Sequence, residues 1–174
     1  MQAEERQRIL VVTTGGTFEK SYCEEEGSLA NRESQLRAHL LGRLRLPRTE
    51  VEIKEIMAID SLYMDDSHRE QIWNHLSAEF PASRPIIVLH GTDTMEHTAA
   101  FCHSMEPFPP VPVIFTGAMV PLAFVDSDGA QNFIEALMAA SMLIPGWYIA
   151  FHNQIFDVPH VKKDKKLRTF VSTV

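Results

Sequence analysis

The stretch Ile86–Met105 reads IIVLHGTDTMEHTAAFCHSM, and its three parts together indicate the class of the fold. It begins with the continuously apolar run Ile86–Leu89, which is typical of a strand covered on both faces. The polar turn His90–Asp93 follows, and apolar side chains then recur at helical spacing over Thr94–Met105. A strand, a turn and a helix in this order form the repeating unit of α/β proteins with a parallel sheet.

The same alternation extends through the rest of the chain. Further apolar runs predict strands at Ile9–Thr13, Val51–Met57, Val113–Phe115 and Trp147–Phe151. Val51–Met57 alternates between apolar and polar side chains, which indicates a position nearer an edge of the sheet. Further helices are predicted over Ser34–Leu44, Asp66–Phe80 and Asp128–Ile144, with Asp65 or Asp66 and then Asp128 as N-caps of the last two.

These elements predict an α/β fold, a three-layer flavodoxin-like domain with a mainly parallel sheet. The length of 174 residues suits one domain, so we expect residues 1–174 to form it. Apolar residues make up 45% of the chain, which is enough for a substantial core. The tail Val161–Val174 is polar and basic and belongs to no clear element of this fold.

Charge and cysteine content narrow the function classes. The chain has a net charge of −7, which disfavours binding to nucleic acid or to an anionic membrane surface. Cys23 and Cys102 fit no zinc spacing, and we expect two free thiols. No apolar stretch precedes Ile9, and Phe133–Phe151 is interrupted by a glutamate and a Pro-Gly pair. We therefore expect no signal peptide, no membrane span and a cytoplasmic location.

Ligands of parallel sheets bind outside the carboxyl ends of the strands, and the segments at these ends are polar. They read TTGGTF, AIDSLYM, HGTDTM, TGAMVP and HNQIFD. Such small hydroxyl, carboxylate and backbone groups suit a small polar substrate. The eight histidines show no metal-ligand spacing, so we expect no metal. A GxGxxG motif and a Walker Lys-Ser/Thr pair are absent, which disfavours a nucleotide loop, and we expect no organic cofactor.

Two of these segments place a threonine directly after a glycine. Thr17 follows Gly16, and Thr92 follows Gly91 with Asp93 beside it. A glycine turn brings backbone N–H groups close to a ligand, and a hydroxyl there can act as a nucleophile if a base takes its proton. The alternative interpretations are a tight structural turn for the first motif and a helix cap for Asp93. Tyr22 and a lysine of the run Lys162–Lys166 are the candidate bases, although such a charge run is usually solvated.

Together these segments resemble the bacterial-type L-asparaginase/glutaminase family. TTGGTF, AIDSLYM, HGTDTMEHTAAFC, TGAMVP and DGAQN occur in the order and spacing of that family, over residues 8 to about 170. The resemblance covers the first domain of the family, whose usual members also have a smaller second domain that completes a neighbouring subunit's active site. It implies a homodimer or a larger homo-oligomer that acts on L-asparagine.

The resemblance implies a catalytic set. Thr17 corresponds to the nucleophile and Tyr22 to the tyrosine that activates it. Thr92 would take part in proton transfer, Asp93 would hold the substrate ammonium, and Lys163 would pair with both. Lys162 is the alternative lysine, and the order in which the two threonines act stays open.

The resemblance also implies substrate-binding residues. They are Gly16, Ser61, Gly91, Asp93 and Ala118, with Ser61 on the α-carboxylate and the carbonyl of Ala118 at the leaving nitrogen. The family glutamine after this serine is Leu62 here, which removes one polar contact and implies a high KM. Val120 replaces a residue that is often basic. Glu19 or the Glu24–Glu26 cluster would have to replace the acidic residue that the second domain supplies.

The predicted function is hydrolysis of L-asparagine to L-aspartate and ammonia through a threonine nucleophile. A glutaminase or another amidase is the alternative within the enzyme class, because one extra methylene changes binding by only about 1–3 kcal/mol. A non-catalytic module that binds asparagine or aspartate, or a structural subunit of an amidotransferase, is the alternative outside it.

Overall fold

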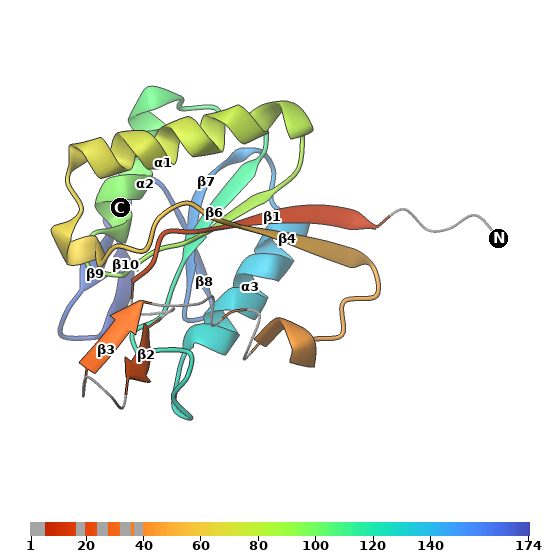
Figure 1. Ribbon diagram of the computed structural model, residues 1–174. Helices are drawn as coiled ribbons and strands as arrows, with labels where there is room; N and C mark the ends of the chain where they lie inside the picture. The colour runs from red at the N-terminus through yellow and green to blue at the C-terminus, as the bar shows by residue number, and fades with distance from the viewer. Residues whose placement is uncertain (1–5, 17–19, 24–27, 32–35, 37–39) are drawn as a thin grey trace.

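A computed structural model describes residues 6–16, 36 and 40–174, together with the backbone of residues 20–23 and 28–31. Within these residues the main sheet has six strands in the order β4-β1-β5-β6-β7-β8 (Figure 1). Their bounds are Gln7–Thr13 for β1, Thr49–Glu55 for β4, Ile86–Leu89 for β5, Pro112–Thr116 for β6, Gly146–Phe151 for β7 and Gln154–Asp157 for β8.

The sheet confirms the predicted fold class. All pairings from β4 to β7 are parallel, and only the edge strand β8 is antiparallel to its neighbour. In chain order the parallel strands follow the flavodoxin-like pattern 2-1-3-4-5. The strand order reverses between β1 and β5, and a crevice at the carboxyl ends of these two strands is the usual ligand site of such a sheet. The alternating strand β4 lies at an edge, as its pattern predicts.

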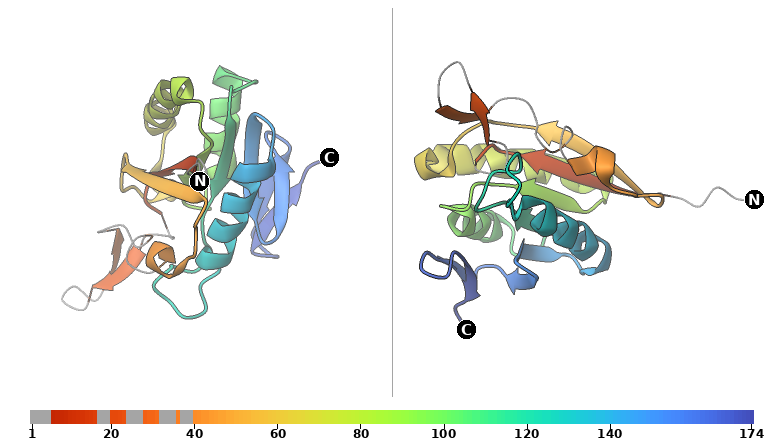
Figure 2. Two further views of the ribbon diagram at one scale, coloured as in Figure 1. Left: turned by 90° about the vertical axis from the view of Figure 1, so that its right-hand side faces the viewer. Right: turned by 90° about the horizontal axis from the view of Figure 1, so that it is seen from below.

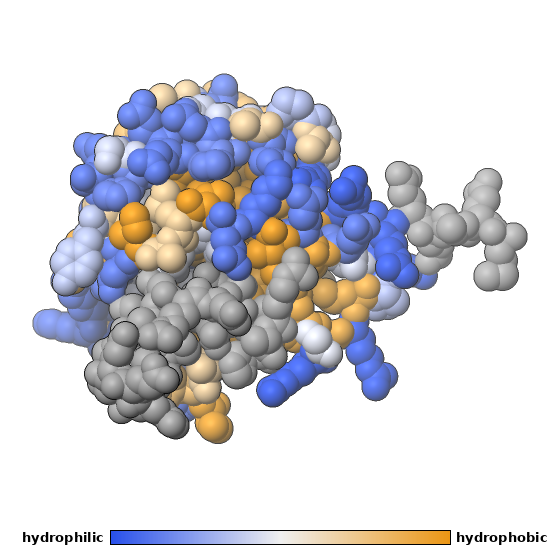
Figure 3. Space-filling view, in the orientation of Figure 1, coloured by the Kyte–Doolittle hydropathy of each residue, from blue (hydrophilic) through white to orange (hydrophobic). Residues whose placement is uncertain are grey.

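Helices cover the sheet on both faces (Figure 1, Figure 2). The helices α1 (Asp66–Glu79) and α2 (Met95–Met105) lie on one side, and α3 (Gly129–Met142) lies on the other. The apolar side chains of each strand alternate between two separate cores, one beneath α1 and α2 and one beneath α3. In the space-filling view, polar side chains cover α1, and apolar side chains gather in the middle of this face, over the edge strand β4 (Figure 3).

The expected helix boundaries hold with small changes. Asp65 caps α1 through a capping box in which its carboxylate accepts from the His68 amide, and three residues of 3-10 helix, Phe80–Ala82, follow the end of that helix. Five of the eleven residues of the expected helix Ser34–Leu44, namely 34, 35 and 37–39, lie outside the described residues. Its last part, Leu41–Arg43, is a single 3-10 turn.

Two small hairpins were not expected. The strands β2 (Lys20–Cys23) and β3 (Ser28–Asn31) pair near the carboxyl edge of the sheet. The prediction that Val161–Val174 belongs to no element is wrong, because β9 (Val161–Asp164) and β10 (Thr169–Ser172) form an antiparallel hairpin there. Phe170 anchors this hairpin, since it is buried and its ring meets that of Phe151 edge to face, with the ring centroids 5.0 Å apart.

No helix in the described part of the chain is long and apolar enough to cross a membrane.

Candidate active site

The turns after β1, β4 and β5 meet at the carboxyl edge of the sheet with almost no space between them. A Cβ placed on Gly16 would lie 2.5 Å from the Cα of Gly91, and a Cβ on Gly91 would lie 2.7 Å from the Cβ of Ser61. Gly16 also has a φ of +86°, which side chains rarely tolerate. The two Gly-Thr turns are therefore in direct contact, and glycine is required at this junction because only a bare backbone fits.

Lys163 reaches this edge from the β9–β10 hairpin. Its Nζ lies 2.8 Å from Thr92 Oγ1 and 2.8 Å from Asp93 Oδ1. The Lys163 side chain is 12% exposed and that of Asp93 43% exposed, so the amine is enclosed while the carboxylate faces solvent. Lys162, one residue earlier on the strand, is exposed. Of the two lysines considered from the sequence, the structure thus brings Lys163 to the threonine.

This triplet can move a proton. An amine held between a hydroxyl and a carboxylate can accept the proton of the hydroxyl when it is itself deprotonated, and the carboxylate stabilises the ammonium that results. Helix α2 begins at Met95 with Thr94 as N-cap residue. The Asp93 carboxylate accepts from Lys163 rather than capping this helix.

Ser61 is buried beside Gly91 in the 3-10 turn Ser61–Tyr63. Asp60 caps this turn by accepting from the Leu62 amide at 3.1 Å, and the Thr94 hydroxyl donates to the Ser61 carbonyl at 2.8 Å. The Ser61 hydroxyl has no hydrogen-bond partner among the described residues. A buried hydroxyl without a partner is costly, so Ser61 has free capacity for a polar ligand. Leu62 is 64% exposed.

His90 is a buried residue that sequence reasoning did not single out. It follows β5 directly, and its Nδ1 lies 2.8 Å from the Gly91 carbonyl oxygen. Burial lowers the pKa of His90 to about 4, so the ring is neutral at physiological pH. Its ring holds the Gly91 carbonyl of the HGTD turn. No local sequence pattern distinguishes such a structural histidine from one that binds a metal or a substrate.

Ala118 is buried in the loop after β6, where a network centred on Asp128 holds the backbone. The Asp128 carboxylate accepts from the amides of Met119 and Val120 at 3.0 Å. Asn132, fully buried on α3, donates to the Gly117 carbonyl at 2.9 Å and to Asp128 at 3.0 Å. The prediction that Asp128 caps α3 is therefore wrong in its chemistry. The residue occupies the N-cap position, but its carboxylate accepts from the loop amides and from the Asn132 side chain and makes no capping hydrogen bond.

The remaining candidates of the first motif are not placed. Thr17, Glu19 and Glu24–Glu26 lie outside the described residues. Tyr22 lies within β2, where its backbone pairs opposite Leu29, and its side chain is outside the described part of the structure.

The described residues at this edge form neither a metal site nor a reactive thiol. Within the described ranges, no three His, Cys, Asp or Glu side chains converge as a metal site would require. Cys102 is a free thiol buried in α2, and burial raises its pKa to about 12, which makes it unreactive.

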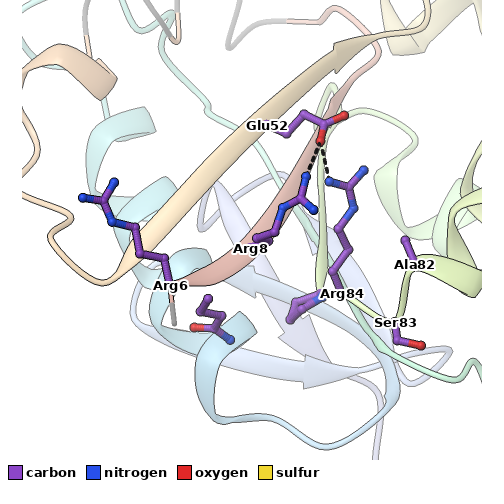
Figure 4. Close-up of a pocket in the computed structure, with 8 residues that line it drawn as sticks. Arg6, Arg8, Glu52, Ala82, Ser83 and Arg84 are labelled. Atoms are coloured by element: carbon purple, nitrogen blue, oxygen red, sulfur yellow. Dashed lines mark hydrogen bonds and ion pairs between the residues drawn. The ribbon is translucent and has the colours of Figure 1, made fainter. Parts of the chain in front are cut away.

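A well-formed pocket of about 640 Å³ lies at the opposite, amino end of the strands (Figure 4). It is lined by Arg6, Arg8, Glu52 and Arg84 among others, and the Glu52 carboxylate lies between the Arg8 and Arg84 guanidinium groups. None of the residues that the sequence motifs single out lines this pocket.

Comparison with known proteins gives a family match over most of the chain. Residues 8–172 match the family model described as Asparaginase, N-terminal. An L-asparaginase of Thermococcus kodakarensis is 31% identical over 156 residues, which is 90% of this chain and 47% of that protein. L-asparaginase 1 of Escherichia coli is 30% identical over 155 residues, or 87% of this chain and 46% of its own length.

A solved structure gives the same result. The thermostable L-asparaginase from Thermococcus kodakarensis superimposes with a TM-score of 0.87 at 30% identity, over 95% of this chain and 51% of that chain. The chain thus spans about half the length of these relatives.

Proposed function

Because this chain belongs to the asparaginase family, we propose that it hydrolyses the side-chain amide of L-asparagine to L-aspartate and ammonia. The observation that carries this proposal is the contact of Lys163 Nζ with both Thr92 Oγ1 and Asp93 Oδ1, at 2.8 Å each, across the carboxyl edge of the sheet. A binding module has no need of a lysine enclosed between a threonine hydroxyl and a carboxylate, whereas amide hydrolysis needs a base at a hydroxyl.

The reaction proceeds in two stages. The Thr17 hydroxyl attacks the amide carbon, and its proton passes to Tyr22 or to the Lys163–Thr92 pair. Backbone N–H groups near Thr17 and Thr92 stabilise the oxyanion of the tetrahedral intermediate. The C–N bond then breaks, the nitrogen takes up a proton and ammonia leaves. Water attacks the resulting β-aspartyl ester, which releases L-aspartate and restores the Thr17 hydroxyl. No metal or organic cofactor takes part.

The described residues suit the substrate in charge and hydrogen bonding. The solvent-facing Asp93 carboxylate binds the α-ammonium, and the unpartnered Ser61 hydroxyl binds the α-carboxylate. The backbone at Gly16 and Gly91 lines the site, and the Ala118 carbonyl meets the leaving nitrogen. Leu62 is exposed and apolar, so it adds no polar contact, and we expect KM in the millimolar range.

Ammonia release from L-asparagine and from L-glutamine, each up to tens of millimolar, tests this proposal. We expect turnover of asparagine by the wild-type protein and its loss in Thr17→Ala. The glutamine curve measures the specificity between the two amides. If Thr92→Ala abolished the acyl-enzyme while Thr17→Ala still formed it, the roles of the two threonines would be reversed.

The second candidate function is a sensor of asparagine or aspartate. The exposed Leu62, in place of a polar substrate contact, is the observation that favours it. Calorimetry separates the two: saturable binding without ammonia release from either amide indicates the sensor.

We also propose a cytoplasmic homodimer or a larger homo-oligomer. Its support is an apolar strip on the outer face of α3 and the adjoining β8, where Ile134, Met138, Met142 and Ile155 are each more than two-fifths exposed. Sedimentation at nanomolar concentration tests the oligomer, and a fully active monomer would contradict it.

A further inference from the structure

His152 occupies a strained position between β7 and β8. Phe151 pairs with Gln154, so His152 and Asn153 form a two-residue hairpin turn, with φ values of 48° and 62°. Such turns favour Asn-Gly, because the left-handed region disfavours residues with bulky side chains. A histidine at the first position therefore costs free energy, which other contacts of that residue must offset.

Both ring nitrogens of His152 have a side-chain partner. Nε2 lies 2.9 Å from Asp128 Oδ2, and Nδ1 lies 3.0 Å from Thr169 Oγ1. Because the Asp128 carboxylate only accepts, Nε2 carries a hydrogen, and in the neutral ring Nδ1 then accepts from the Thr169 hydroxyl. The backbone amide of His152 also donates to Asn132 Oδ1 at 3.0 Å.

The two partners belong to different parts of the candidate site. Asp128 holds the amides of Met119 and Val120, which immediately follow Ala118. Thr169 lies on β10, whose next residue, Phe170, pairs with Lys163. The imidazole therefore bridges the loop that carries the Ala118 carbonyl and the hairpin that carries the site lysine.

We infer that His152 is a positioning residue that fixes the Ala118 loop and the Lys163 hairpin relative to each other. It touches neither substrate nor reacting atoms. Its effect on turnover rests on the proposed function, since the leaving nitrogen meets one of the two segments and the proton-transferring amine belongs to the other. The mechanical link between the segments does not depend on that function.

The experiment combines hydrogen exchange with kinetics on His152→Ala, Thr169→Val and His152→Gln. In His152→Ala we expect amide exchange about tenfold faster in residues 117–121 and in residues 161–172, with β1 and β5 unchanged. Thr169→Val cuts only one end of the link, so exchange rises in residues 161–172 alone. We expect kcat of His152→Ala to fall about tenfold or more with a smaller change in KM, and His152→Gln to recover part of it through a bond to Asp128.

Asn153→Gly is the matched control, because it changes the same turn and relieves its φ without touching either partner. It should keep wild-type exchange and kcat. The inference is overturned if His152→Ala leaves either segment at the wild-type rate, or if exchange rises equally in β1 and β5. If the wild-type protein releases no ammonia, the proposed function fails. The exchange pattern then still shows whether His152 fixes the Ala118 loop and the Lys163 hairpin relative to each other.

Discussion

The two ends of the parallel sheet use polar side chains in opposite ways. At the amino end of β5, Arg84 donates to both Glu52 and Glu79, and Lys54, further along β4, donates to Glu79. These groups form one continuous chain of ion pairs. At the carboxyl end, the hydroxyl of Ser61 and the Nε2 of His90 are buried with no partner in the described part of the chain. The amine of Lys163 there lies between a hydroxyl and a solvent-facing carboxylate.

This difference shows why a pocket alone is a poor guide to function. In the pocket of about 640 Å³ at the amino end, the guanidinium groups of Arg8 and Arg84 are paired with Glu52 (Figure 4). Paired charges stabilise the fold and leave little capacity for a ligand. Polar groups that the fold buries without partners retain that capacity, and Ser61 and His90 are two such residues at the opposite end.

The largest expected effect is a loss of kcat when Lys163, the amine of the carboxyl end of the sheet, is replaced. Lys163→Met keeps much of the side-chain volume and removes the amine between Thr92 and Asp93. We expect kcat for asparagine to fall by about 10²–10⁴-fold, the usual contribution of a proton-transfer group. Lys162→Met is the control, since that side chain is exposed, and it should retain full activity. Equal losses in both variants would show that only the charge of the hairpin matters.

The second test fills the glycine junction. An alanine at Gly91 would bring its Cβ within 2.7 Å of Ser61 Cβ, so the two turns must separate. We expect a loss of about 1–3 kcal/mol in the free energy of unfolding, as for other overpacked sites, together with a raised KM. Denaturant unfolding and ammonia release measure the two effects. Gly42→Ala is the control because no described residue lies within 4 Å of its Cβ position, and it should behave as wild type.

The third test breaks the ion-pair chain at the amino end. Arg84→Met leaves Glu52 and Glu79 without their shared guanidinium, so we expect Tm to fall by about 2–4 °C. The kcat and KM for asparagine should stay at wild-type values, because the substitution lies at the far end of the sheet. A large loss of kcat in a folded variant would mean that the two ends are coupled.

The same variant has a defined pH dependence. Hydrogen bonds from Lys54 to Glu79 and from Arg84 to Glu52 hold the pKa of each carboxyl below its ordinary value. Since the folded-state pKa is the lower one, the stabilisation is complete above the unfolded-state pKa and disappears as pH falls through the folded-state pKa. The Tm difference between wild type and Arg84→Met should therefore be largest at neutral pH and shrink below about pH 4.5.

The smallest effect is expected at Arg8. Its guanidinium lies 3.8 Å from Glu52, and its side chain is 63% exposed. Solvent screens such a pair, so Arg8→Gln should change the free energy of unfolding by less than about 0.5 kcal/mol. Chemical denaturation of the two proteins in parallel measures this, and a loss as large as that of Arg84→Met would show that the pair is not screened.

Much of the fold was predictable because it depends on local patterns. Continuous apolar runs identify the central strands, and helical spacing identifies α1, α2 and α3 within one or two residues of their ends. The β9–β10 hairpin escaped prediction because its strands are short and β9 is charged. Within these two strands, only Val161 and Phe170 are buried in the core. Residues 161–174 carry too few apolar positions for a pattern to appear.

The candidate site was predictable only in part. The Gly-Thr turns could be predicted because each comes directly after an apolar run. The choice between Lys162 and Lys163 could not, because adjacent residues of a strand point to opposite faces and the sequence does not show which face of β9 meets Thr92. The contacts of Asp128 with the loop after β6 were not predicted, because an aspartate directly before a helix is already accounted for as an N-cap. His152 was missed because its partners lie 24 and 17 residues away in the chain.

Lys163 lies on the last hairpin of the chain, and this position affects when the site can form during synthesis. Asp93 and Lys163 are separated by 70 residues, so the triplet cannot form until most of the chain is synthesised and a long loop has closed. A nascent chain carries both Gly-Thr turns well before it carries their lysine. During synthesis, the candidate site is therefore completed only when the last hairpin has emerged and packed against the sheet.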